Sequence, residues 1–126
     1  MIKFILISLG VLVAIIVIGG TIFMTYGMGR TKNAIISDVN LSRVPDGVYK
    51  GSYSGGRWSN QIMVAVSGGK IVTVVTSKPM LISMEEIAQK VYSAVVEKQS
   101  LQVDTVSSAT VTTKAVLKAI ENALKR

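Results

Sequence analysis

The 126-residue chain contains neither cysteine nor histidine. These two absences exclude thiol nucleophiles, imidazole acid–base catalysis and ordinary zinc sites. They also exclude a lipoprotein acylated on a new N-terminal cysteine. Neither Ser107 nor Ser108 lies in a Gly-x-Ser-x-Gly turn, and the six carboxylates after residue 45 show no paired spacing. The sequence therefore offers no set of side chains for hydrolysis.

Acidic side chains are scarce: seven stand against fourteen lysines and arginines, which gives a formal net charge of +7. From Pro45 onward, ten basic residues face six acidic ones, and they are spread along the chain. Nucleic-acid-binding domains typically gather lysine and arginine into a patch with interleaved aromatic residues. No such cluster occurs here, so we expect no nucleic-acid partner.

Charge is absent altogether from Phe4 to Gly29. The run supplies about 20 residues of suitable hydrophobicity, and at about 1.5 Å per residue such a helix crosses a hydrocarbon layer of about 30 Å. A secretory signal has a shorter apolar region, of about 7 to 15 residues, and ends in a small-x-small cleavage site. We therefore interpret residues 1–29 as an uncleaved membrane anchor, with a cleaved signal as the alternative. The flanking charges, Lys3 against Arg30 and Lys32, are too nearly balanced to orient it.

Residues 30–45 contain polar turn formers with a few isolated aliphatic residues, and we interpret them as a short tether. Ile35, Ile36 and Val39 are its candidates for packing on the folded part. That part is predicted to span residues 46–126, which is small for one hydrophobic core and permits only one domain.

Three strand-like runs open the domain, at residues 47–54, 60–68 and 70–78. The second alternates Ile62, Val64 and Val66 on one face, and the third is predicted to alternate Ile71, Thr73 and Val75 against Val72, Val74 and Thr76. Gly68-Gly69 between them suits a two-residue hairpin turn, which needs positive φ angles. We therefore expect an antiparallel meander.

Two helices follow the strands. Ser83 to Glu86 has the pattern of a capping box ahead of the first helix, and residues 99–104 could form a short strand after it. The second helix is predicted over residues 112–126, with Val116, Leu117, Ile120, Ala123 and Leu124 on one stripe. The fold class is thus α+β: a small antiparallel sheet with two helices on one face, preceded by one transmembrane helix.

The segment "DTVSSATVTT", residues 104–113, crowds hydroxyl side chains ahead of the last helix. Helix N-termini present unpaired backbone amides and the positive end of the dipole, so a phosphate could bind there or be esterified to a hydroxyl. Simple capping by serine and threonine is the alternative, and it is the preferred interpretation for Thr112 and Thr113.

Residues Asp104 to Thr110, "DTVSSAT", resemble the flavinylation motif of the FMN-binding domain family, Asp-x-x-(Ser/Thr)-Gly-Ala-Thr. The segments "DGVYKGSY", "VAVSGGKIVTVV" and "TTKAVLKAIENAL" are similar to the opening strand, hairpin and closing helix of that family. The resemblance covers residues 46–126. The family includes the C subunit of sodium-pumping NADH:quinone oxidoreductases and the G subunit of Rnf complexes.

The resemblance implies a covalent FMN cofactor, joined through its phosphate to the last threonine of the motif by a Mg-dependent transferase with FAD as donor. Thr110 would be the acceptor and Asp104 the leading acid, and Ser107 and Ala109 match the motif directly. Ser108 departs from it, because the family usually has glycine there. A serine costs strain of about 1 kcal/mol if the position needs a positive φ angle.

The function implied by this resemblance is that of an electron carrier rather than a stand-alone enzyme. It would be a single-pass protein of the cell membrane, with the flavin on the extracytoplasmic side exchanging electrons with membrane or extracellular redox partners. Two alternatives remain. One is a non-redox adaptor that keeps the fold without the cofactor, and the other is a domain that binds FMN non-covalently.

Overall fold

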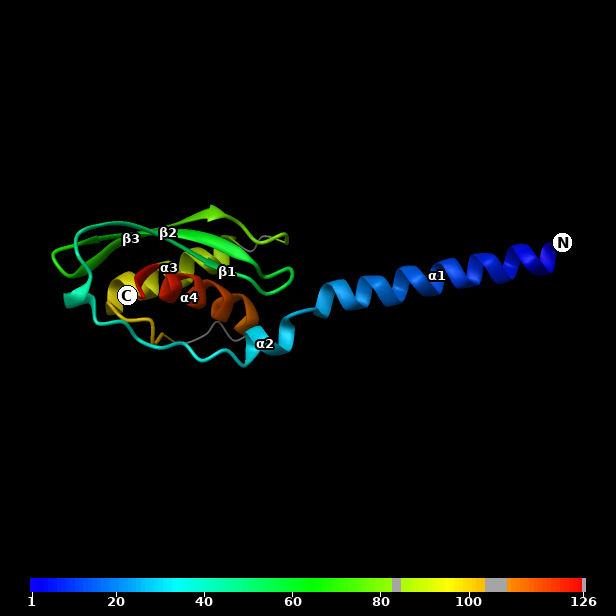
Figure 1. The fold of residues 1–126 in the computed structure, drawn as a ribbon, viewed down its shortest axis with the longest axis horizontal. Helices are drawn as coiled ribbons and strands as arrows, with labels where there is room; N and C mark the ends of the chain where they lie inside the picture. Colours follow the sequence, from blue (N-terminus) through cyan, green and yellow to red (C-terminus); the bar gives the residue numbers. More distant parts are fainter. Residues whose placement is uncertain (83–84, 104–108, 126) are drawn as a thin grey trace.

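The N-terminal apolar run forms one long helix, α1 (Ile2–Thr25), that projects from the rest of the molecule (Figure 1). The computed structural model describes residues 1–82, 85–103 and 109–125. None of α1 is buried, and by length and composition it is able to cross a membrane. A helix of this kind is consistent with either a membrane anchor or a signal sequence.

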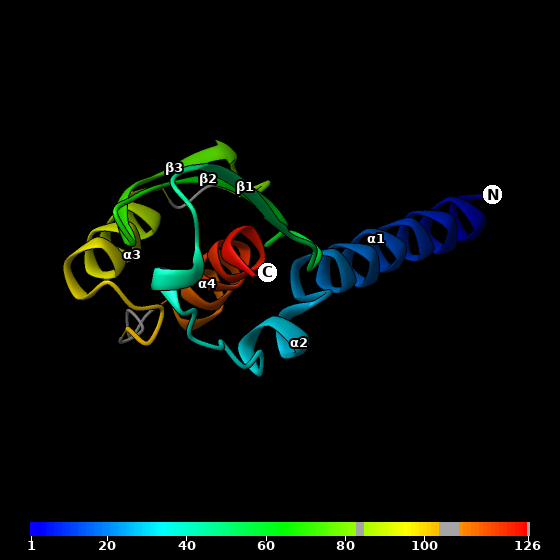
Figure 2. The same ribbon diagram turned by 60° about the vertical axis from the view of Figure 1, so that its left-hand side comes forward.

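The folded part is a three-stranded antiparallel sheet with two helices on one face (Figures 1 and 2). The strand order is β1-β2-β3, and α3 and α4 lie side by side beneath the sheet. This confirms the predicted α+β class. The elements after α1 are α2 (Met28–Lys32), the 3-10 helix η1 (Leu41–Arg43), β1 (Gly47–Tyr53), β2 (Asn60–Ser67), β3 (Lys70–Lys78), α3 (Glu85–Lys98) and α4 (Thr110–Leu124).

The β2–β3 hairpin turns at Gly68 and Gly69, whose φ angles of 60° and 74° are those that the turn requires. The predicted alternation along β3 is wrong. Val66 pairs with Ile71 but Ala65 pairs with Thr73, so Val72 is an extra residue in the strand. Such a bulge shifts the alternation by one residue. Ile71 and Val74 are therefore both buried.

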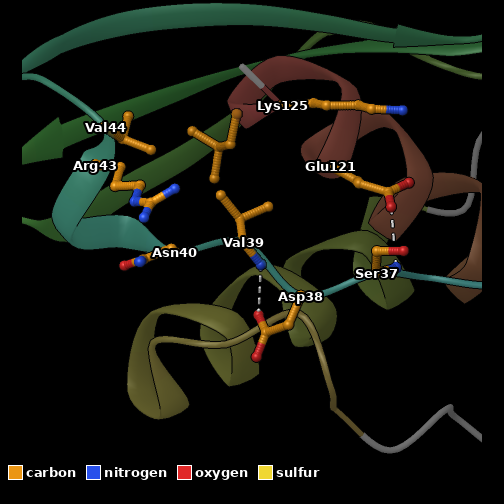
Figure 3. A pocket seen from close by; sticks show the side chains of 9 residues that line it. Ser37, Asp38, Val39, Asn40, Arg43, Val44, Glu121 and Lys125 are labelled. Carbon is orange, nitrogen blue, oxygen red and sulfur yellow. Dashed lines mark hydrogen bonds between the residues drawn. The ribbon is translucent and has the colours of Figure 1, made fainter.

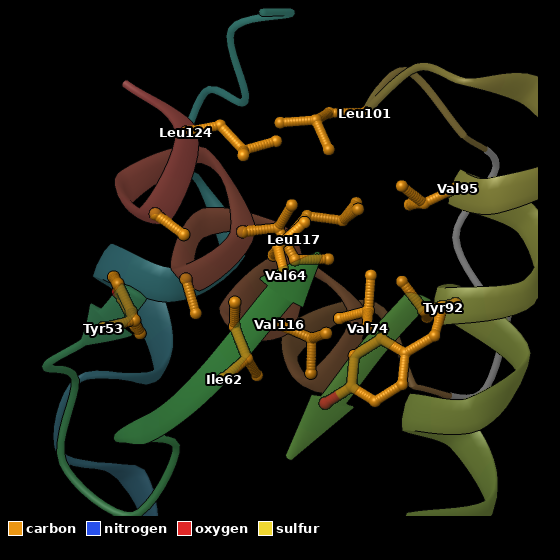
Figure 4. Packing of buried hydrophobic residues seen from close by; sticks show 14 of the residues in the cluster. Tyr53, Ile62, Val64, Val74, Tyr92, Val95, Leu101, Val116, Leu117 and Leu124 are labelled. Carbon is orange, nitrogen blue, oxygen red and sulfur yellow. The ribbon is translucent and has the colours of Figure 1, made fainter. Parts of the chain in front are cut away.

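The core lies between the sheet and the two helices α3 and α4 (Figure 4). The predicted stripe of α4 is buried, and so are most of the other side chains of this helix. The reason is that α2 and α3 also contact α4, on sides that the sheet leaves open. β1 approaches α4 so closely that a Cβ on Gly51 would overlap the Ala119 carbonyl oxygen and Ala123. Gly51 therefore permits the contact between sheet and helix. Figure 4 labels the core residues Tyr53, Ile62, Val64, Val74, Tyr92, Val95, Leu101, Val116, Leu117 and Leu124.

Three predictions about where helices and strands begin can be compared with the structure only in part. α4 begins at Thr110, so Thr112 and Thr113 are buried inside the helix, and their interpretation as cap residues is wrong. The predicted capping residue of α3, Ser83, lies outside the described residues. Of the predicted strand over 99–104, residues 99–103 are described and form no strand.

Residues 33–44, here called the belt, run along α4 on the side away from the sheet (Figure 1). The Lys114 ammonium donates to the Ala34 carbonyl at 3.1 Å, and the Gln102 amide donates to the Ile36 carbonyl at 2.6 Å. Ile36 and Val44 belong to the core, and Val39 packs against it, whereas Ile35 is exposed. The chain between α2 and β1 is thus held against the domain along its length.

Two carboxylates hold the middle of the belt. Glu121 accepts from the backbone amide of Ser37 at 2.9 Å and is paired with Lys118. Asp38 accepts from the amide of Leu101 at 3.1 Å and the hydroxyl of Ser100 at 2.8 Å. A cavity of about 290 Å³ lies between the belt and the C-terminal end of α4 (Figure 3).

Burial alone would raise the pKa of both carboxyl groups, but the hydrogen bonds that they accept, with Lys118 beside Glu121, outweigh it. The pKa of Asp38 is therefore lowered from 3.8, and that of Glu121 from 4.5. A lowered pKa in the folded state contributes stability that is complete above the ordinary value and is lost as the pH falls through the folded-state value.

We expect acid to destabilise the fold partly through these two groups. Glu121→Gln should flatten the fall in melting temperature between about pH 6 and about pH 3, because one linked proton is removed. The measurement is thermal denaturation of the full chain in detergent. Glu97→Gln, at an exposed position on α3, is the matched control. Equal acid slopes in the two variants would contradict the assignment.

Candidate functional site

The N-terminal end of α4 is the first feature of the candidate site. Thr110 is the first residue of the helix, and Ala109 before it has no side chain that could cap the helix. The first hydrogen bond within the helix runs from the Thr113 amide to the Ala109 carbonyl, at 2.9 Å. The amides that come before Thr113 in the first turn therefore have no acceptor within the helix itself. No acidic residue occupies the first turn. This helix end therefore keeps its positive character for an anion.

A small cavity opens beside this helix end. Its lining comes from the start of β2, the end of β3, the first turns of α3 and the first half of α4. The space open to a water-sized sphere is about 10 Å³, about the room of one water molecule. The cavity is thus too small to enclose a ring system, and a planar group would lie across its mouth. Its lining residues are Asn60, Thr76, Pro79, Met80, Glu85, Ala88, Tyr92, Thr112 and Val116.

Asn60 gives this cavity an unsatisfied acceptor. Its amide nitrogen donates to the carbonyl oxygens of Trp58 at 3.0 Å and Ala115 at 3.3 Å. The side-chain oxygen is buried, and no donor among the described residues reaches it. Since only 7% of Asn60 is exposed, the missing bond costs about 1–3 kcal/mol unless a bound group supplies a donor.

A hydrogen-bonded chain forms the opposite wall. The Thr76 hydroxyl donates to Glu85 at 2.9 Å and lies 2.6 Å from the Tyr92 hydroxyl. A hydroxyl has one proton to donate, so Tyr92 is the donor in its contact with Thr76. Burial raises the pKa of the Tyr92 phenol above 10.0, and the negative charge of Glu85 raises it further. The wall therefore keeps the phenol protonated and ordered.

The structure places only part of the predicted motif. Ala109 and Thr110 lie at the start of α4, whereas Asp104, Ser107 and Ser108 lie outside the described residues. Asn60, Thr76 and Tyr92 were missed by sequence reasoning. They come from three different elements, and no spacing along the chain brings them together.

The fold and this site define a class of protein: a small α+β domain in which a helix N-terminus adjoins a small cavity lined by a buried asparagine. Comparison with protein families then identifies it. The sequence profile of the FMN-binding domain family matches residues 55–125. The chain belongs to this family, which confirms the resemblance drawn from the motif and implies FMN as its cofactor.

One relative in the comparison is an "Uncharacterized protein" of Treponema pallidum (strain Nichols). It is 33% identical over 99 residues, which cover 77% of this chain and 28% of the relative. The chain therefore spans little more than a quarter of the length of the protein it matches.

The described residues fit a flavin mononucleotide. The amides at the start of α4 suit the phosphate, because the positive end of the helix dipole favours an anion and the first turn contains no acidic residue. The buried Asn60 oxygen is an acceptor in a residue that lines the same cavity, and no donor among the described residues satisfies it. Thr110 carries a hydroxyl at this helix end and is only partly buried. These groups belong to one end of the domain.

Tyr92 offers a test of the cavity wall. Tyr92→Phe should cost about 0.5–1.5 kcal/mol of unfolding free energy, because the bond to Thr76 is lost. A raised pKa contributes stability below the ordinary value of 10.0 that is lost as the pH rises through the folded-state value. The variant should therefore lose stability less steeply above about pH 10 than the wild type.

Chemical denaturation at a series of alkaline pH values measures both effects. Tyr26→Phe, at an exposed position, is the control and should retain the wild-type slope. An unchanged slope in Tyr92→Phe would exclude the proposed linkage.

Proposed function

We propose that the protein is a membrane-anchored electron-transfer flavoprotein that carries FMN esterified to Thr110. The observation that carries the proposal is the position of Thr110 as the first residue of α4, in a first turn that contains no acidic residue. Thr112 of the same turn lines the cavity that Asn60 also lines. The family match supports FMN as the ligand, and the motif supports Thr110 as its attachment point. The bound FMN would accept and release electrons, which is chemistry that none of the protein side chains provides.

The chain's own residues bind and orient the cofactor. In the attachment step, a separate Mg-dependent transferase would join the Thr110 hydroxyl oxygen to the FMN phosphorus of FAD. The bond between the FMN and AMP halves would break, so that AMP leaves and the hydroxyl proton is released. The amides of the α4 first turn would hold the resulting diester, since it keeps a negative charge. The hydrogen-bonded wall of Thr76, Glu85 and Tyr92 would give one side of the ring a fixed surface.

An extracytoplasmic location agrees with covalent attachment, because FMN that dissociates outside the cell is lost to the medium. The apolar α1 supports a membrane anchor by length and composition. A partner for electron exchange would then be another membrane protein or an extracellular acceptor. The non-covalent binder and the cofactor-free adaptor remain the alternatives, and Ser108 in place of glycine is the feature that favours them.

The attachment site is tested by the intact mass of the full chain co-expressed with a flavin transferase. We expect a gain equal to FMN less one water on the wild type and on Thr110→Ser, which keeps the hydroxyl. Thr110→Ala should lose the adduct completely. Thr105→Ala, at a variable position of the motif, is the matched control and should keep it.

Covalent flavin on Thr110→Ala would contradict the assignment. Yellow protein that releases its colour on unfolding would favour the non-covalent binder. Folded, colourless wild-type protein made with the transferase would favour the adaptor.

A further inference from the structure

The junction between α1 and the domain is short and makes tertiary contacts. Only Tyr26 and Gly27 separate α1 from α2, and the Tyr26 amide still donates to the Ile22 carbonyl of α1 at 2.7 Å. The junction packs against the loop between β1 and β2. We call these two segments, Tyr26 to Thr31 and Tyr53 to Arg57, the elbow.

A buried pair of hydroxyl groups closes one side of the elbow. The Thr31 side chain is fully buried, and its oxygen lies 2.8 Å from the Tyr53 hydroxyl at the end of β1. Both groups are removed from water, so each depends on the other for its hydrogen bond. α2 is thereby fixed to the sheet.

Two glycines let the main chains of the elbow touch. A Cβ on Gly27 would come within 2.8 Å of the Gly55 carbonyl carbon, and one on Gly56 would overlap the Tyr26 carbonyl oxygen. Any larger residue at either position must push the two segments apart. The contact is therefore between backbones, which leaves little freedom for the domain to swing.

Arg57 connects the same loop to the end of α1. Its Nε donates to the Met24 carbonyl at 3.2 Å, and its guanidinium lies 4.1 Å from the centre of the Trp58 ring. The last carbonyls of a helix lack intrahelical donors, so this bond caps α1 from the domain side. A cation at this position also opposes the negative end of the helix dipole.

The elbow determines which end of the domain faces the anchor. Tyr53 pairs with Asn60, and Gln61 beside it pairs with Lys78, so the ends of all three strands meet there. The N-terminal end of α4 lies at this end too, and the C-terminus lies at the opposite one (Figure 1). The chain leaving β3 exposes Leu81 by 70% and Ile82 by 42%.

We propose that this end of the domain rests on the lipid headgroups of the membrane that α1 spans. Leu81 and Ile82 enter the interface, and Arg57 and Lys78 lie near the lipid phosphates. The lipid surface is the occupant because it is continuous with the anchor, and the elbow leaves the domain no length of free chain. The inference depends on the anchor in the proposed function. It adds that the Thr110 site lies at the level of the membrane surface.

Trp58 provides the measurement, because it is the one tryptophan of the chain and directly follows the elbow, in contact with Arg57. The full chain, made without the transferase so that no flavin quenches it, is reconstituted into phosphatidylglycerol–phosphatidylcholine vesicles. A trace of lipid with a nitroxide on its headgroup serves as the quencher. Wild-type Trp58 should lose most of its emission.

Two matched glycine variants test the elbow. Gly56→Ala should recover much of the lost emission, because the new methyl group displaces the Tyr26 segment. Gly68→Ala should remain as quenched as the wild type: its φ of 60° matches the 61° of Gly56, but a Cβ there meets nothing within 4 Å. Thr31→Val, which removes the hydroxyl bonded to Tyr53, is the second variant if Gly56→Ala does not fold. If Gly56→Ala is quenched as strongly as Gly68→Ala, the role of the elbow is overturned. The same comparison applies to Thr31→Val where it replaces Gly56→Ala.

A second pair tests the lipid contact itself. Leu81→Asp should reduce the quenching, whereas Val48→Asp, at a position 62% exposed near the far end of β1, should not. One outcome is that the wild-type protein folds and keeps α1, as shown by its intact mass in the vesicles, and is still quenched only weakly. That result would overturn the contact between the domain and the lipid headgroups, and would leave the anchor in place. A chain that has lost α1 and remains in solution would overturn the anchor and the seating together.

Discussion

The enclosure of α4 is the constraint on which the rest of the structure depends. The sheet covers one side of this helix through the close approach at Gly51, and the belt covers the side away from the sheet through Glu121 and Lys114. A helix buried on so many sides cannot shift along its axis without breaking several of these contacts. Its first turn is therefore held in place, and with it Thr110 and the backbone amides beside it.

Local patterns were enough to predict most of the fold. Alternating aliphatic residues and the Gly68-Gly69 pair predicted the meander, and the apolar run predicted α1. The bulge at Val72 could not be read from the pattern, because a strand with β-branched residues on both faces gives the same pattern in either register. The burial of Thr112 and Thr113 was missed for a related reason. Their hydroxyl groups suit a helix cap, and only the tertiary packing places them in the core.

The candidate site was predictable only where it is continuous in sequence. The motif pointed to Ala109 and Thr110, and the structure places both at a helix N-terminus. Asn60 gave no signal, because a single asparagine at the first position of a strand has the ordinary appearance of a residue leaving a turn. Its significance comes from burial next to Ala115, which is distant in the chain. The belt was equally hard to foresee, since Ile36 and Val44 are isolated aliphatic residues among polar ones.

If the protein carries electrons as proposed, the glycine contact between Tyr26 and Gly56 limits how it would meet redox partners. A redox head on a long flexible linker samples a hemisphere of solution and carries electrons by swinging. Under the proposed seating, a head fixed to its membrane helix has only two freedoms, rotation about the membrane normal and drift within the plane. Encounters with redox partners would then be two-dimensional collisions. Their frequency would depend on the density of both proteins per unit area of membrane, and on the fluidity of the lipid.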